Sequence, residues 1–184
     1  MDYQKKLFDT LEKSSVQSNI GNKFDIEDLK NIFKTAKKNS HQIFFIGNGG
    51  SAAIAEHMTV DFLKNGRMRT VSMFAPPTLT CLANDYGYEY VFSKQLEFLA
   101  NENDLLVAIS SSGNSPNIVN AVNKAIELKM KVLTFSGFDS DNKISHSGDY
   151  NLYVPSHEYG TVESIHNLIL QQIVDEIKSE EEKN

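Results

Sequence analysis

The chain has 184 residues, of which 40% are hydrophobic and 23% charged, a composition typical of one globular domain with a sizeable core. No apolar stretch approaches the roughly 20 residues of a membrane span, and the charged start of the chain does not resemble a signal peptide, so we expect no membrane contact. The formal net charge of -6 argues against nucleic acid binding, and the single cysteine, Cys81, excludes an internal disulfide and favours a cytoplasmic location.

The hydrophobic pattern predicts two leading helices, followed by strands that alternate with helices. Apolar residues recur at helical spacing in residues 2–20 and 25–39, and a continuous apolar run then predicts a buried strand at residues 43–46. Further strands are expected at residues 70–74, 105–109, 131–135 and 150–154, and further helices at residues 51–63, 89–100, 117–128 and 161–177. This order favours an α/β fold, a doubly wound parallel five-stranded sheet of the flavodoxin-like kind, in which ligands bind beyond the carboxyl ends of the strands.

Two charged segments are expected to be solvated and to bind no ligand. Lys34, Lys37 and Lys38 lie near the end of the second predicted helix, where positive charge suits the helix dipole. The tail KSEEEKN, beyond residue 177, is expected to fray.

A glycine loop follows the first predicted strand and opens a helix. The segment GNGGSA at residues 47–52 fits G-x-G-x-x-A, one form of the dinucleotide-binding motif, but the second strand ends in FAPP at residues 74–77, without an acidic residue to hold a ribose. We therefore interpret the loop as an anion site, in which glycines allow close approach and the N–H groups at the helix start bind the anion. The alternative is a tight turn that needs glycine only for its dihedral angles.

A serine loop follows the third predicted strand and also precedes a helix. Its hydroxyls come from Ser110, Ser111, Ser112 and Ser115, and no Lys or Arg is near them in the sequence. Hydroxyls, backbone N–H groups and the helix dipole can hold a phosphate without a cation. The alternative is an ordinary polar turn with Ser115 as the helix cap. Because both loops follow strands, we expect them at the same edge of the sheet.

The two loops, their spacing and the strand order resemble the sugar isomerase (SIS) family, and within it the phosphoheptose isomerases. The resemblance is carried by GNGGSAAIAEH, CLANDYGYEYVFSKQLE, ISSSGNSPNIVNAV and YGTVESIH. It implies a single SIS domain over residues 1–184, with helices in residues 1–40 packing between the subunits of a homotetramer and an α/β core in residues 41–178. It also implies a sugar-phosphate substrate, sedoheptulose 7-phosphate, which is isomerised to D-glycero-D-manno-heptose 7-phosphate for lipopolysaccharide or capsule.

By position, the resemblance also implies the residues of the site. It places the sugar phosphate against Asn48, Gly49, Gly50 and Ser51, the sugar hydroxyls against Asn84 and Asp85, and the phosphate on Ser110, Ser111, Ser112 and Ser115. It further implies a zinc ion, one per subunit, held by His57, Asp61, Glu163 and Gln171. Three of these depart from the family pattern: Asp61 replaces a glutamate, Glu163 a glutamine and Gln171 a histidine.

These departures decide which groups can carry protons. Isomerisation needs a base beside the reacting carbonyl, so Asp61 and Glu163 are the catalytic candidates, whereas the amide of Gln171 does not titrate near neutral pH. His57 and Asp61 share a helix face at i, i+4, although His57 alone could equally be a half-buried helix residue. His166 lies roughly 140° around the helix from Gln171 and is not expected to replace the missing histidine.

The missing histidine leaves a second function open. A non-catalytic SIS-domain protein that binds a sugar phosphate or another protein is the alternative, and isomerisation of a different sugar phosphate is a third possibility. The retained loops and the carboxylates of Asp61, Asp85 and Glu163 favour the isomerase.

Overall fold

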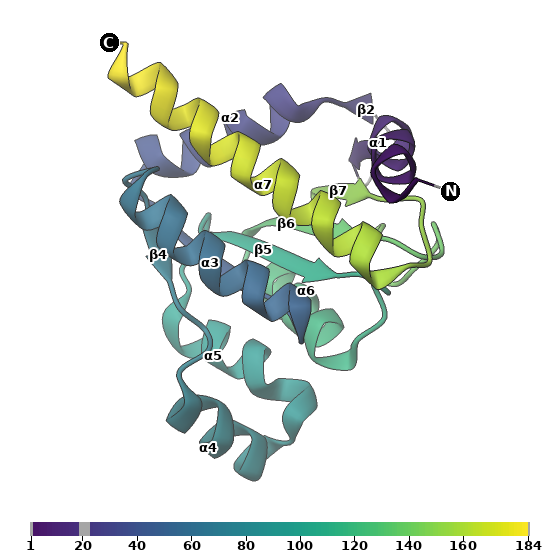
Figure 1. The fold of residues 1–184 in the computed structure, drawn as a ribbon. Coiled ribbons are helices and arrows are strands. Elements are labelled where there is room, and N and C mark those ends of the chain that lie inside the picture. Colours follow the sequence, from purple (N-terminus) through teal and green to yellow (C-terminus); the bar gives the residue numbers. More distant parts are fainter. Residues whose placement is uncertain (1, 19–22, 184) are drawn as a thin grey trace.

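A seven-stranded sheet forms the centre of the computed structural model, which describes residues 2–18 and 23–183. The strand order is β2-β1-β7-β6-β5-β3-β4, and β7, β6, β5, β3 and β4 run parallel (Figure 1). These parallel strands are β3 (Gln42–Ile46), β4 (Arg69–Val71), β5 (Leu105–Ser110), β6 (Lys131–Ser136) and β7 (Tyr150–Tyr153). The predicted α/β class and its five parallel strands are confirmed. The count of five is too low for the whole sheet, because two antiparallel strands extend it.

The extra strands come from a segment predicted to be helical. Helix α1 (Tyr3–Lys13) ends before Ser14, and β1 (Ser15–Ser18) then pairs antiparallel with β7 and with β2 (Lys23–Phe24). The prediction of one helix over residues 2–20 is therefore wrong after Lys13, and its last two positions lie outside the described residues. Val16 explains the difference, since it buries its side chain against the core from a strand rather than from a helix.

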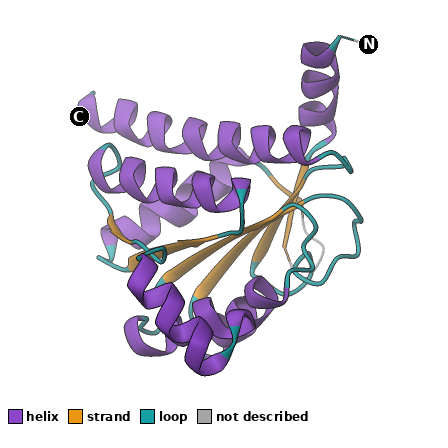
Figure 2. Cartoon of the chain, turned by 60° about the horizontal axis from the view of Figure 1, so that its bottom comes forward, coloured by secondary structure: helices purple, strands orange, loops and turns teal. Residues whose placement is uncertain are grey.

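Helices cover both faces of the sheet (Figures 1 and 2). One face carries α2 (Ile26–Lys38), α3 (Gly50–Lys64) and α7 (Tyr159–Glu182), and the other carries α4 (Pro76–Tyr86), α5 (Val91–Leu99) and α6 (Pro116–Glu127). A short 3-10 helix, η1 (Tyr88–Tyr90), joins α4 to α5. The sequence did not predict α4, because its two leading prolines indicated only the end of a strand, although proline is well tolerated in the first turn of a helix.

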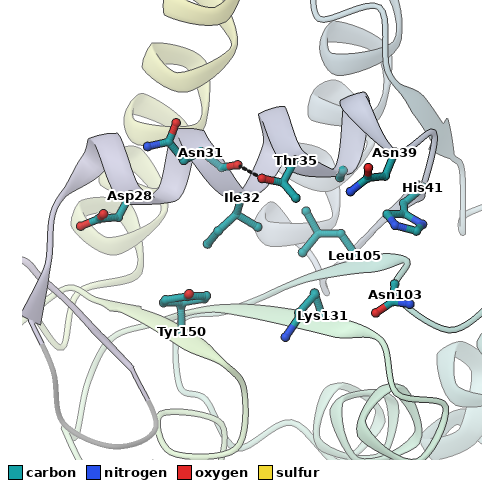
Figure 3. A pocket seen from close by; sticks show the side chains of 11 residues that line it. Asp28, Asn31, Ile32, Thr35, Asn39, His41, Asn103, Leu105, Lys131 and Tyr150 are labelled. Carbon is teal, nitrogen blue, oxygen red and sulfur yellow. Dashed lines mark hydrogen bonds between the residues drawn. The ribbon is translucent and has the colours of Figure 1, made fainter.

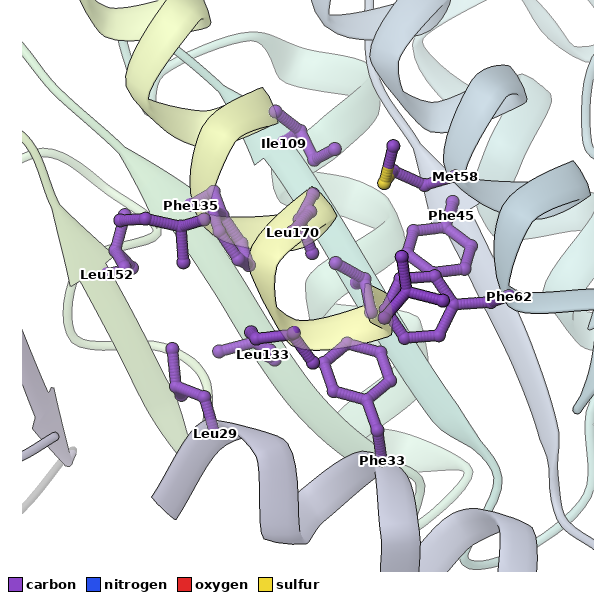
Figure 4. Packing of buried hydrophobic residues seen from close by; sticks show 14 of the residues in the cluster. Leu29, Phe33, Phe45, Met58, Phe62, Ile109, Leu133, Phe135, Leu152 and Leu170 are labelled. Carbon is purple, nitrogen blue, oxygen red and sulfur yellow. The ribbon is translucent and has the colours of Figure 1, made fainter. Parts of the chain in front are cut away.

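Aromatic rings join α2, β3 and α3 in the core. Phe62 packs against Phe33 and Phe45, with ring centroids 4.5 and 5.3 Å apart, respectively (Figure 4). All three side chains are fully buried. Because helices cover β3 on both faces, its sequence is a continuous apolar run. Since Phe33 is part of this core, α2 packs against the sheet of the same chain. The predicted role of residues 1–40 in subunit packing stays a prediction.

Ion pairs hold the end of α7 against α2, so the prediction that the tail frays is wrong up to Glu182. Lys34 contacts Glu180 at 2.6 Å, and Lys37 pairs with Glu181. Lys30 is 5% exposed and lies among three carboxylates. These carboxylates belong to Glu27, Glu176 and Glu180. The charges that suggested a solvated helix end therefore connect two helices.

Replacing Lys30 with methionine is expected to lower the melting temperature by roughly 5 °C at neutral pH, because three carboxylates lose their shared cation. Hydrogen bonds from Lys30 and Lys34 hold the pKa of Glu180 down at about 2, so this stabilisation is present above its ordinary value of 4.5 and is lost as pH falls below that value. Melting curves of both proteins from neutral pH to about pH 3 test this. A difference that stays constant across the range contradicts it.

Among the described residues, no helix combines the length and the apolar character that crossing a membrane requires.

Candidate functional site

The glycine and serine loops lie side by side and line one cavity of about 310 Å³. They follow β3 and β5, which are paired parallel neighbours with Ile46 opposite Ala108. The prediction that both loops share the carboxyl edge of the sheet is confirmed. The lining residues are Asn48, Gly49, Gly50, Ser51, Ile109, Ser110, Ser111, Ser112, Ser115, Tyr159 and Glu163. None of them is a lysine or an arginine, so any anion here is held by hydroxyls, N–H groups and helix starts.

The glycine loop needs its glycines for its backbone course as well as for access. Gly49 has φ +55° and ψ −122°, a conformation that is nearly restricted to glycine. A Cβ at Gly47 would lie 2.5 Å from the backbone carbon and oxygen of Ser51. The tight-turn interpretation and the anion interpretation therefore both apply. The turn places the start of α3, at Gly50 and Ser51, in the cavity wall, where a helix start favours an anion.

The serine loop leaves hydroxyls available to a ligand. Ser115 is the N-cap residue of α6 by position, yet its side chain makes no capping hydrogen bond. The Ser111 Oγ atom is buried and has no hydrogen-bond partner among the described residues. A buried hydroxyl without a partner costs free energy, and this one belongs to the loop that lines the cavity.

Glu163 brings a carboxyl group from the first turns of α7 to the start of α3. A Cβ added at Gly50 would lie 2.6 Å from the Cδ atom of Glu163, so only glycine leaves room for this carboxyl group. Burial raises the pKa of Glu163 above its ordinary value. A carboxyl group with a raised pKa at the wall of a ligand cavity is suited to proton transfer.

Tyr159 lines the cavity but was not among the residues predicted from the sequence. It lies in the first turn of α7, 60% exposed, and its ring meets the edge of Phe138 with centroids 4.9 Å apart. An exposed aromatic residue at a helix start belongs to no binding motif, so the sequence did not identify Tyr159 as a cavity residue.

Asn84 and Asp85 do not reach the cavity within one chain. Both are exposed on α4, where Asn84 donates to the Asp85 Oδ1 atom at 2.9 Å and the Cys81 thiol lies 3.6 Å from Oδ2. Figure 1 shows α4 at the outer side of the face that carries α5 and α6. Their predicted contacts with sugar hydroxyls stay a prediction.

The four predicted zinc ligands do not form one cluster. His57 Nε2 lies 3.5 Å from Asp61 Oδ2, whereas Gln171 donates to Asp175 at 3.2 Å. Asp61 follows Gly50 by roughly 16 Å along α3, and Glu163 lies beside Gly50. Within residues 2–18 and 23–183, no group of three or more His, Cys, Asp or Glu side chains could hold a metal ion. The donors of one chain therefore do not fit a zinc site, and zinc binding stays a prediction.

His166 is a core residue rather than a cavity residue, in line with the expectation from its helical position. Its Nε2 atom lies 3.1 Å from the backbone oxygen of Ser136, and its ring packs edge-on against Phe135. Burial lowers the pKa of His166 to about 4, so the ring is neutral near pH 7.

A second, larger cavity of about 580 Å³ lies at the opposite edge of the sheet (Figure 3). It is bounded by α2 and by the first residues of three strands, Leu105, Lys131 and Tyr150. Neither loop contributes to it, and Lys131 pairs with Asp149 at 3.3 Å. Of these two cavities the smaller is therefore the better candidate for a sugar phosphate, because the starts of α3 and α6 and the serine hydroxyls converge on it.

The chain is similar to proteins named phosphoheptose isomerase over most of its length. The family model described as the SIS domain matches residues 2–137, which include both loops. The chain is 41% identical to the phosphoheptose isomerase of Campylobacter jejuni over 150 residues, covering 76% of this chain and 79% of the relative. It is 33% identical to the phosphoheptose isomerase of Helicobacter pylori strain P12 over 180 residues, which cover 91% of this chain and 93% of the relative. The solved phosphoheptose isomerase of Neisseria gonorrhoeae superposes with a TM-score of 0.78 at 33% identity, covering 84% of this chain and 85% of that chain.

Proposed function

Because the chain belongs to the SIS domain family and, within it, to the phosphoheptose isomerases, we propose that it isomerises sedoheptulose 7-phosphate to D-glycero-D-manno-heptose 7-phosphate for surface polysaccharide synthesis. The observation that supports this most is the cation-free cavity between the two loops, with the carboxyl group of Glu163 at its wall. The loops account for phosphate binding, and the carboxyl group accounts for proton transfer.

The phosphate is proposed to lie at the serine loop. Ser115 offers a hydroxyl that makes no capping bond, the Ser111 hydroxyl in the same loop has no partner among the described residues, and the dipole of α6 favours an anion at its start. A cradle without a cation holds a phosphate by directed hydrogen bonds. This arrangement leaves the sugar end of the substrate toward the glycine loop and Glu163.

The proposed reaction moves a proton between neighbouring carbons. Glu163 removes a proton from C1 of the ketose, an enediolate forms across C1 and C2, and the C2 oxygen takes up a proton. In the second half of the reaction, C2 receives a proton and the C1 hydroxyl loses one. The product then has an aldehyde at C1 and a hydroxyl at C2. The free N–H groups of the glycine loop and α3 lie where they can stabilise the enediolate charge. Asp61 stays a predicted second proton carrier.

We expect kcat/KM to rise with pH through a midpoint above 4.5, the ordinary pKa of a glutamate, since the base must be ionised and burial raises the pKa of Glu163. The same shift means that the folded chain binds this proton more tightly than the unfolded chain, so Glu163 lowers the stability of the fold as pH rises through that pKa. A pH–rate profile tests this. A midpoint at or below the ordinary value contradicts it.

A direct assay separates the proposed function from its alternatives. The purified chain is mixed with sedoheptulose 7-phosphate, and the aldose is detected by NMR. Formation of the aldose supports the isomerase, whereas binding without product identifies a non-catalytic sugar-phosphate protein. Product from another ketose phosphate alone identifies a different substrate.

Zinc, the homotetramer and the cytoplasmic location stay predictions. Repeating the assay with added zinc and with a chelator tests the first, and the mass of the protein in solution tests the second.

A further inference from the structure

The side chain of Asn48 is held by two residues that do not line the cavity. Asn48 Nδ2 donates to Asn117 Oδ1 at 2.9 Å, and Asn117 Nδ2 donates back to Asn48 Oδ1 at 2.8 Å. The hydroxyl of Tyr88 also donates to Asn48 Oδ1, at 3.0 Å. Asn117 is only 2% exposed in the first turn of α6, and Tyr88 comes from η1. Three separate elements therefore meet at one amide group.

Counting donors and acceptors shows what this arrangement leaves to a ligand. A side-chain amide has two acceptor sites on its oxygen and two N–H donors. Both acceptor sites of Asn48 are occupied by Asn117 and Tyr88, and one of its N–H groups is bound to Asn117. Asn48 lines the cavity, so the group that it can offer there is a single N–H donor.

We propose that Asn117 and Tyr88 are positioning residues, which hold the Asn48 amide so that its remaining N–H group points at a substrate oxygen. The identity of that oxygen rests on the proposed function: it is an oxygen of the enediolate, where a fixed donor is most effective. Asn117 lies two residues after Ser115, so the amide pair also ties the glycine loop to the end of the serine loop. The pair thereby fixes the distance between the two halves of the site.

Asn117→Asp and Tyr88→Phe test this inference. The aspartate keeps the shape but places an oxygen against Asn48 Oδ1, and its negative charge suits the start of α6, so the chain should still fold. We expect kcat to fall about 30-fold in Asn117→Asp and about 5-fold in Tyr88→Phe, with KM changed less than about 3-fold. Asn123→Asp is the matched control. It makes the same change at an exposed position of the same helix, and should keep kcat within about 2-fold.

A double-mutant cycle separates positioning from general damage to the fold. In an Asn48→Ala background, Asn117→Asp and Tyr88→Phe should lower kcat no further, because they act through the amide that is already gone. Losses in that background as large as in the wild-type background would overturn the inference.

The inference can still be tested if the chain does not catalyse the proposed reaction. The same cycle is measured on the Kd of sedoheptulose 7-phosphate by calorimetry, and the side-chain amide signals of Asn48 are followed by NMR. Without ligand, Asn117→Asp and Tyr88→Phe should shift these signals and Asn123→Asp should not. Absence of turnover in the wild type removes the proposed function alone, whereas unchanged Asn48 signals in both variants remove this inference.

Discussion

Glu163→Gln is expected to lower kcat about 1,000-fold while the Kd of sedoheptulose 7-phosphate changes less than about 3-fold. Glutamine fills the same space beside Gly50 but carries no proton that it can exchange near neutral pH. Stopped assays with excess enzyme measure the residual rate, and calorimetry measures binding.

Glu158→Gln is the control for this variant. Glu158 lies just before α7 and pairs with Lys6 rather than lining the cavity, so its loss should change kcat less than about 2-fold. Near-normal turnover in Glu163→Gln would remove Glu163 from the mechanism. An equal loss in both variants would point to disturbance of the whole start of α7.

Gly50→Ala is expected to abolish most activity without unfolding the chain. The new Cβ meets only the far end of the Glu163 side chain, which can rotate away, so the carboxyl group leaves its position and kcat falls about 100-fold. The melting temperature should hold or rise slightly, because alanine suits a helix start better than glycine does. Activity assays and melting curves measure the two effects separately.

Gly47→Ala provides the contrasting result. Its Cβ meets the backbone of Ser51 and Ala52, which has no room to move, so this variant should lose several kcal/mol of unfolding free energy. In a Glu163→Gln background, Gly50→Ala should cost little further activity. A large drop in the melting temperature of Gly50→Ala, or full activity in that variant, contradicts the close approach of Glu163.

The sequence predicted the parallel sheet because its strands are buried on both faces. Residues 43–46 form a continuous apolar run, and in the structure these positions of β3 are fully buried. The same principle could not find β1, where a single buried residue, Val16, sits among polar neighbours. Pairing with β7, a contact between distant parts of the chain, overrides the local helical pattern there.

The site could be predicted where it depends on loops that follow strands, and less well where it depends on long-range contacts. The glycine and serine loops meet in one cavity, as expected from parallel topology, and Glu163, which only the family resemblance implied, lies in the same cavity wall. The amide pair of Asn48 and Asn117 has no sequence signal, because its partners are 69 positions apart. The helical spacing of His57 and Asp61 brings these two side chains together, as expected, but supplies no further zinc ligand, so zinc binding stays a prediction.

The sheet ends on both sides in very short strands, the two residues of β2 and the three residues of β4. An exposed edge strand is a template on which a second chain can polymerise, and a short edge offers few backbone hydrogen bonds for that growth. The long, apolar strands β3, β5 and β6 all lie inside the sheet. The antiparallel pair of β1 and β2, of which β1 replaces part of the expected first helix, thus covers β7, where an aggregation-prone edge would otherwise be exposed.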